Sequence, residues 1–312
     1  AFTTEFHRGK LSDLVSLLSG RNFETRVFEE SIAEDSFRRL KDGIFTFMNE
    51  TSFNKFIMII KSAGFIAPWM IRSKNALNFA YILYLTLKKQ GQNPALIETY
   101  VRRWFAMSIL TSRYSSSPES TMDYDIKRIS ELSFDSYFKT IEDGNLSDAY
   151  WTVMLPQALE TPVTSAPVFH VYLAAQVKQN NKGFLSKDIT VNHLITNAGD
   201  VHHLFPKNYL KKNNLGRSQY NQVANFVYMQ SEINIKVGDK PPSVYFNELK
   251  EQANNGGLKY GGIKTMEELF DNLRQNAIPE GIFNMEIDNY REFLSHRRTL
   301  MAKKIQEYYF GL

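Results

Sequence analysis

The chain has 312 residues, of which 43% are hydrophobic and 22% are charged, and its formal net charge is +4 at pH 7. This length allows one large domain or two to three small ones with a sizeable core, and the mildly basic balance permits nucleic-acid binding without requiring it. The absence of cysteine excludes disulfides, cysteine-ligated zinc and a thiol nucleophile, and it fits a cytoplasmic protein.

Neither a membrane span nor a signal peptide is predicted. The most apolar run, 56–71, is interrupted by Lys61, Gly64 and Pro68 and is too short to cross a bilayer. The first ten residues, AFTTEFHRGK, lack an apolar core segment. Because the chain begins with Ala rather than Met, we expect a fragment or a processed product whose N-terminal part is missing.

Residues 1–150 are predicted to form a helical domain. Apolar residues keep helical spacing over 11–18, 37–48 and 75–89, and Ser73 can cap the last of these helices. Asn93 followed by Pro94 is typical of a helix start, a cap and then the first helical position. Serine, proline and glycine predict breaks near 115–119 and 144–147.

Residues 151–312 are predicted to form a second domain whose character changes near residue 180. A helix is expected to open at Pro167, and two short strands are expected at 202–205 and 225–230, followed by a short helix after Ser231. A basic amphipathic helix is expected at 289–309, and its basic face is expected to be solvated, with contact to DNA as the alternative; the face consists of Arg297, Arg298, Lys303 and Lys304. The predicted fold class is therefore mainly α, with a small ββα unit at about 197–240 and flanking helices.

A pair of adjacent histidines, His202 and His203, is the most informative feature, because the chain has six histidines in all. Neighbouring side chains on a strand point to opposite faces, so both can serve one site only if the strand bends or a loop folds over it. Asn225 follows at the head of the second expected strand, and Asn234 lies nine residues later in the expected helix.

The phrases DVHHLFP and NFVYMQSEINIK resemble the HNH, or ββα-metal, nuclease motif. The resemblance implies that His202 binds one divalent cation and that His203 is the general base. It also implies that Asn225 braces the loop holding the base and that Asn234 completes the protein's metal ligands. A histidine titrates near neutral pH, as deprotonation of water requires, and two neutral ligands with several waters suit Mg²⁺ or Mn²⁺.

Longer phrases resemble the C-terminal half of GmrSD-type, modification-dependent restriction proteins. They are VRRWFAMSILTSRYSSSPES, NIKVGDKPPSVYF and RRTLMAKKIQEYY, and the resemblance runs from about residue 5 to the end. In that family an N-terminal NTP-binding module related to ParB precedes a helical region and an HNH nuclease, and the Asp-Gly-Gln-Gln-Arg type phrase of that module is absent here. The resemblance implies a DNA endonuclease of a restriction or phage-defence protein, acting on modified or unmodified DNA beside that module.

Basic residues border the expected site. The stretch 207–217 is predicted to be a phosphate-contacting loop, with a solvated surface loop as the alternative; its basic residues are Lys207, Lys211, Lys212 and Arg217. Lys236 lies close to where members of the nuclease family place a basic residue. Asp200 is either a hydrogen-bond partner for a histidine nitrogen or a turn residue.

Two other classes of function stay open in the sequence. The chain can be a catalytically inactive DNA-binding or assembly module, or an interaction domain whose helical half docks a partner. No predicted helix carries a base-reading pattern, so contacts to the DNA backbone are expected to dominate in any DNA complex.

Overall fold

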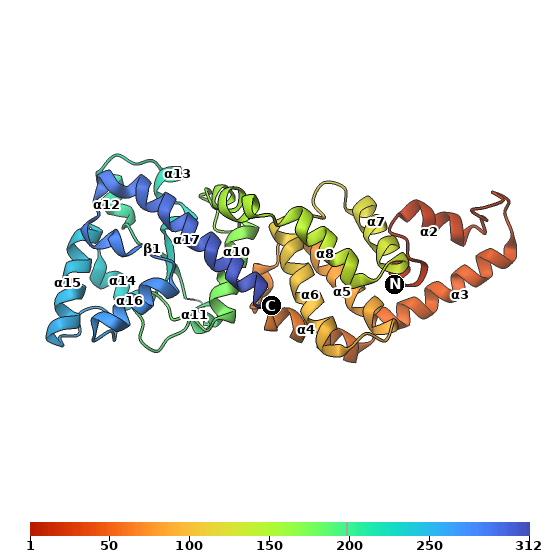
Figure 1. Cartoon of the computed structure of the whole chain (residues 1–312), viewed down its shortest axis with the longest axis horizontal. Helices are drawn as coiled ribbons and strands as arrows, with labels where there is room; N and C mark the ends of the chain where they lie inside the picture. The colour runs from red at the N-terminus through yellow and green to blue at the C-terminus, as the bar shows by residue number, and fades with distance from the viewer. Residues whose placement is uncertain (198) are drawn as a thin grey trace. The chain divides into compact units, whose positions relative to one another are not determined.

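A computed structural model describes residues 1–197 and 199–312 and confirms that the chain is mainly helical. The described residues divide into two compact units, the first made of 1–61, 73–146 and Leu312 and the second of 62–72 and 147–311. In Figure 1 the first unit runs from red to yellow-green, and most of the second runs from green to blue. No described helix is both long and apolar enough to cross a membrane.

The first unit is built from helices that follow the apolar periodicity of the sequence. Ser73 Oγ accepts a hydrogen bond from the Ala76 amide at 3.2 Å and Asn93 Oδ1 accepts one from the Ala95 amide at 2.9 Å, which confirms both predicted helix starts. The helices are α1 (Phe2–Phe6), α2 (Leu11–Leu18), α3 (Glu30–Phe47), α4 (Glu50–Ser62), α5 (Lys74–Lys89), α6 (Pro94–Leu110), α7 (Pro118–Glu131) and α8 (Phe134–Asn145).

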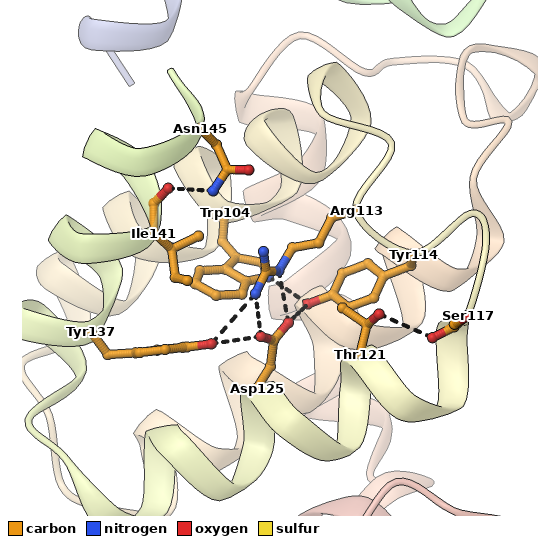
Figure 2. Close-up of polar contacts among 9 residues, drawn as sticks. All are labelled: Trp104, Arg113, Tyr114, Ser117, Thr121, Asp125, Tyr137, Ile141 and Asn145. Atoms are coloured by element: carbon orange, nitrogen blue, oxygen red, sulfur yellow. Dashed lines mark hydrogen bonds and ion pairs between the residues drawn. The ribbon is translucent and has the colours of Figure 1, made fainter. Parts of the chain in front are cut away.

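A buried polar cluster lies in the core of the first unit beside the ring of Trp104 (Figure 2). Asp125 is fully buried and accepts hydrogen bonds from both Nε and Nη2 of Arg113 and, at 2.6 Å each, from the hydroxyls of Tyr114 and Tyr137. The Trp104 indole in turn donates to the Tyr114 hydroxyl at 3.0 Å. Because every member has a partner, this cluster can stay buried without an unsatisfied charge.

The second unit contains the remaining helices and the two strands. Its apolar core is formed mainly by α10, of which nine residues are buried, and by the C-terminal helix α17. The elements are η1 (Pro68–Met70), η2 (Tyr150–Met154), α9 (Leu155–Ala158), α10 (Pro167–Lys178), α11 (Val191–Thr196), β1 (Val201–His203), α12 (Lys207–Lys212), α13 (Arg217–Tyr220), η3 (Val223–Asn225), β2 (Phe226–Tyr228), α14 (Ser231–Val237), α15 (Pro242–Asn255), α16 (Met266–Gln275), η4 (Glu280–Asn284), η5 (Ile287–Asn289) and α17 (Tyr290–Phe310).

The segment 62–72 belongs to the second unit although it is far from the rest of it in sequence. The Tyr308 hydroxyl donates to the Ala63 carbonyl at 2.6 Å, and His170 Nδ1 lies 3.0 Å from the Met70 carbonyl oxygen. Gly64 has a φ of +95° and packs against the backbone of Ala174, where a Cβ would collide with the carbonyl. These contacts fasten the segment to α10 and α17.

A salt-bridged cluster on α15 involves Glu248. Its Oε2 atom receives hydrogen bonds from Lys240 at 2.8 Å and from the Tyr260 hydroxyl, and it lies 2.9 Å from Lys259 Nζ. Burial alone would raise the pKa of Glu248, but the hydrogen bonds from Lys240, Tyr260 and Lys259 bring it down to about 2.

The two strands form one short antiparallel sheet in which His203 pairs with Phe226 and His202 pairs with Val227. Both strands are shorter than predicted, because β1 ends at His203 rather than at Phe205 and β2 begins at Phe226 rather than at Asn225. Asn225 ends the 3₁₀ turn η3 instead. The chain therefore leaves the strand conformation directly after His203 and enters it again directly after Asn225.

Candidate functional site

Strand β1 and helix α14 bring three of the predicted residues to one pocket. His202, His203 and Asn234 line a hollow of about 320 Å³ whose wall also includes Pro206 and Lys207. Asn234 lies in α14, which begins at Ser231 as predicted. Adjacent histidines can share this pocket because β1 ends at His203, where the chain turns toward α12.

Asn225 is fully buried and bridges the beginning and the end of the connection between β1 and β2. Its Oδ1 accepts from the Phe205 amide at 2.8 Å, and its Nδ2 lies 3.1 Å from the Phe205 carbonyl and 3.2 Å from that of Tyr220. Its own carbonyl accepts from the Leu204 amide at 2.8 Å. The Asn225 side chain therefore hydrogen-bonds to both the amide and the carbonyl of Phe205, two residues after His203.

His203 is oriented by an amide that the sequence reasoning missed. Its Nε2 lies 3.0 Å from Asn221 Oδ1, and its ring packs edge-on against Phe226 with centroids 5.0 Å apart. Because an amide oxygen can only accept, Nε2 is the protonated nitrogen, which leaves the Nδ1 lone pair available. Burial lowers the pKa of His203, the Asn221 hydrogen bond partly offsets this, and nearby Lys207 lowers the pKa further.

His202 has a buried nitrogen without a partner. Its Nε2 is shielded from solvent and makes no hydrogen bond to the described residues, which is an uncommon state for a buried polar atom. Burial lowers the pKa of His202, and the Asp200 carboxylate opposes this shift more weakly. Asp200 is exposed and makes no hydrogen bond to His202 or His203. It therefore does not act as the hydrogen-bond partner of a histidine nitrogen, which was one of its two predicted roles.

The donor set of this pocket fits a divalent cation. A neutral imidazole and an amide oxygen are both metal ligands, and the pocket wall includes His202 and the half-buried Asn234, whose side chains carry one of each. Nowhere in 1–197 or 199–312 do three or more His, Cys, Asp or Glu side chains gather as a metal site. A cation here would therefore depend on these two residues together with water or substrate oxygens.

The basic stretch 207–217 is not the loop that was predicted. It folds mostly into α12 and the start of α13, because Pro206 is compatible with a helix start and Leu210 anchors the first turn in the core. Lys207 lies in the pocket wall, while the other basic residues lie outside that wall: Lys211, Lys212, Arg217 and Lys236.

The individual basic side chains differ in their partners. Lys212 forms an ion pair with Asp239 at 3.2 Å. The Nζ atoms of Lys207 and Lys211 lie 5.8 and 5.7 Å from the ring centroid of Tyr220, within cation–π range. Arg217 and Lys236 are exposed. The positive charge is thus concentrated on α12 at one side of the pocket.

Comparison with known proteins gives one distant relative. The chain is 25% identical over 222 residues to an uncharacterized protein of Methanocaldococcus jannaschii, and the match covers 66% of this chain and 37% of that protein. The chain thus spans little more than a third of the curated relative that it matches. No protein-family model matches the chain. No solved structure matches it either.

Proposed function

We propose that this chain is a metal-dependent DNA endonuclease of the HNH type, which hydrolyses phosphodiester bonds. The observation that carries the proposal is one pocket lined by His202, His203 and Asn234, together with the hydrogen bond by which Asn225 holds the backbone at Phe205. The sequence phrases identified these four residues, and the pocket unites three of them although they come from two separate elements.

In this proposal His203 acts as the general base. Its Nε2–H donates a hydrogen bond to Asn221 Oδ1, so its Nδ1 can accept a proton from water as that water attacks phosphorus. The lowered pKa keeps the imidazole neutral near pH 7, which is the form that a base requires. Asn225 fixes the turn that follows β1, so the ring keeps its direction.

A divalent cation such as Mg²⁺ or Mn²⁺, held by His202 and Asn234, would polarise the phosphate and stabilise charge on the leaving oxygen. Lys207 in the pocket wall would attract the phosphodiester, and Lys211, Lys212, Arg217 and Lys236 would extend that attraction along the backbone. The wider role rests on the sequence resemblance alone: a cytoplasmic restriction or phage-defence protein that acts beside an NTP-binding module.

The test is cleavage of supercoiled plasmid in Mg²⁺, in Mn²⁺ and in EDTA. Wild type is compared with His203→Ala and with His193→Ala, which removes an exposed histidine from α11. We expect cleavage that requires the metal, falls about 10²–10⁴-fold in His203→Ala and is unchanged in His193→Ala.

A parallel titration of Mn²⁺ binding separates the alternatives. Metal binding that is lost in a His202→Ala, Asn234→Ala variant supports the assigned ligands. DNA binding that survives His203→Ala, with no cleavage in either metal, would replace the nuclease with the non-catalytic DNA-binding module.

A further inference from the structure

A second hollow lies at the other end of β1, within the second unit. It measures about 410 Å³ and lies between η1, the start of α10 and the sheet. Its aromatic lining consists of Trp69, Phe169, His170 and Tyr228, and its rim is polar, with Arg72, Thr164, Ser165 and Asp200. An aromatic lining with a few hydrogen-bonding groups is typical of a pocket for a planar polar ring, and of these four rings Trp69 is the exposed one.

Trp69 is held in place but remains accessible. It is 44% exposed, and its ring meets His170 edge-on with centroids 5.2 Å apart. His170 is itself buried, and its two ring nitrogens lie 3.0 and 3.2 Å from the carbonyl oxygens of Met70 and Thr164. Met70, which follows Trp69, is therefore hydrogen-bonded to His170 of α10. This contact holds the backbone beside Trp69 while the indole stays exposed to solvent.

The polar rim offers both charge and hydrogen-bonding groups. Arg72 is exposed and makes no hydrogen bond or ion pair with the described residues, so its guanidinium can stack on a ring or contact a phosphate. The Tyr228 hydroxyl has no hydrogen-bond partner among the described residues. Asp200 can accept from an exocyclic amino group, and Thr164 can donate or accept.

The position of this hollow relates it to the proposed cleavage site. Val201 lines the hollow, and the next residue, His202, lines the catalytic pocket. The two hollows adjoin the same strand, but neighbouring side chains on a strand point to opposite faces, so a nucleotide strand whose phosphate lies in the catalytic pocket brings an adjacent base to the hollow by passing the end of β1. A base inside a duplex is stacked and cannot enter such a pocket, so the base must be unpaired or extruded.

We propose that this hollow binds one unpaired nucleobase of the strand that is cut, by stacking it on Trp69 beside the scissile phosphate. The inference rests on the proposed nuclease function, which it extends from duplex backbone contacts to a substrate with an unpaired or extruded nucleotide. Arg72 binds the phosphate or the outer face of that nucleotide.

The experiment measures DNA binding by the full chain in EDTA, so that cleavage does not contribute. The probes are a fluorescein-labelled single-stranded oligonucleotide, its duplex form, and the single strand with one 2-aminopurine. The variants are Trp69→Ala, Trp69→Phe and Arg72→Gln, and the matched control is Tyr124→Ala, which removes an exposed aromatic ring of the first unit. Far-UV circular dichroism verifies that each variant is folded.

We expect Trp69→Ala to weaken single-strand binding about 5- to 150-fold, the range for loss of one base–aromatic stack. Trp69→Phe should restore most of that loss, Arg72→Gln should weaken binding to a smaller extent, and Tyr124→Ala should bind as wild type does. The 2-aminopurine emission should be quenched by wild type and much less by Trp69→Ala.

Each contrary outcome has one meaning. Single-strand binding that is equal in wild type, Trp69→Ala and Arg72→Gln overturns the base pocket and leaves the nuclease proposal intact. An absence of DNA binding in every protein overturns the pocket and the DNA substrate together. Binding that depends on Trp69, in a protein that cuts no plasmid in Mg²⁺ or Mn²⁺, supports the pocket and refutes the nuclease.

Discussion

Replacing Asn225 with alanine tests whether one buried amide holds the turn after β1. The substitution leaves the Phe205 amide and carbonyl without their partners, and the Tyr220 carbonyl keeps a longer contact of 3.4 Å with the Tyr290 hydroxyl. Asn225 is fully buried, so water cannot replace it without opening the fold. Two orphaned backbone groups at about 1–3 kcal/mol each predict a loss of about 2–6 kcal/mol in the free energy of unfolding.

Urea denaturation of wild type and Asn225→Ala measures this difference, and hydrogen–deuterium exchange of the peptide 201–230 locates it. A loss of this size is a large share of the 5–15 kcal/mol that stabilises a typical domain, so exchange in this peptide should accelerate strongly. Asn254→Ala, which truncates an exposed asparagine of α15, should change stability by less than about 0.5 kcal/mol. A loss below about 1 kcal/mol for Asn225→Ala, with unchanged exchange, would refute the bracing role.

Three further substitutions or conditions have defined outcomes. Asn221→Ala should reduce metal-dependent plasmid cleavage about 10–100-fold while Mn²⁺ binding is retained, because it frees the His203 ring without touching a ligand; an unchanged rate would show that the hydrogen bond does not orient the base. Asp125→Asn should destabilise the first unit by about 3–5 kcal/mol in thermal denaturation, since it leaves the Arg113 guanidinium without a negatively charged partner, and exchange in 201–230 should stay unaffected. The Glu248 carboxylate, with a folded-state pKa of about 2 against its usual 4.5, contributes stability that is present above about pH 4.5 and is lost as the pH falls toward 2; Glu248→Gln should remove this part of the acid dependence, and identical acid titrations of the two proteins would contradict the assignment.

The sequence was sufficient to predict the residues that gather at the pocket, because motif order carries that information. His202, His203 and Asn234 stand in a fixed order along the chain, and helix capping at Ser73 and Asn93 could be predicted from local chemistry alone. The caps depend on residues that are near one another in sequence, and the motif depends on the order of residues along the chain, so both can be read without knowledge of long-range packing.

The hydrogen-bond partner of His203 could not be predicted in the same way. Asn221 is one of several asparagines between 208 and 225, and nothing in its own neighbourhood distinguishes it from Asn213 or Asn214. Its role depends on which face of the turn meets His203, and that is decided by the short α13 and by the packing of Tyr220. The helix α12 was missed for a related reason, since burial of Leu210 rather than propensity stabilises it.

Long-range packing also decided two features of the second unit. The segment 62–72 was assigned by its place in the sequence, but hydrogen bonds from Tyr308 and His170 attach it to α17 and α10. Arg297 was expected on a solvated helix face and is instead fully buried. A basic residue in an amphipathic helix gives no sign of such burial, because the groups that bind it are backbone carbonyls from distant segments.

The buried Arg297 explains why the C-terminal helix belongs to the unit that carries the candidate site. Its Nη1 donates to the Ala224 carbonyl at 2.8 Å, directly before Asn225, and its Nη2 donates to the Asn276 carbonyl at 3.2 Å. The Tyr290 hydroxyl of the same helix donates to the Gln219 carbonyl at 3.0 Å. Helix α17 thus holds both ends of the turn that presents Asn221 and Asn225. The segment 197–240 alone lacks these donors, so the structural unit that carries the candidate site includes α17.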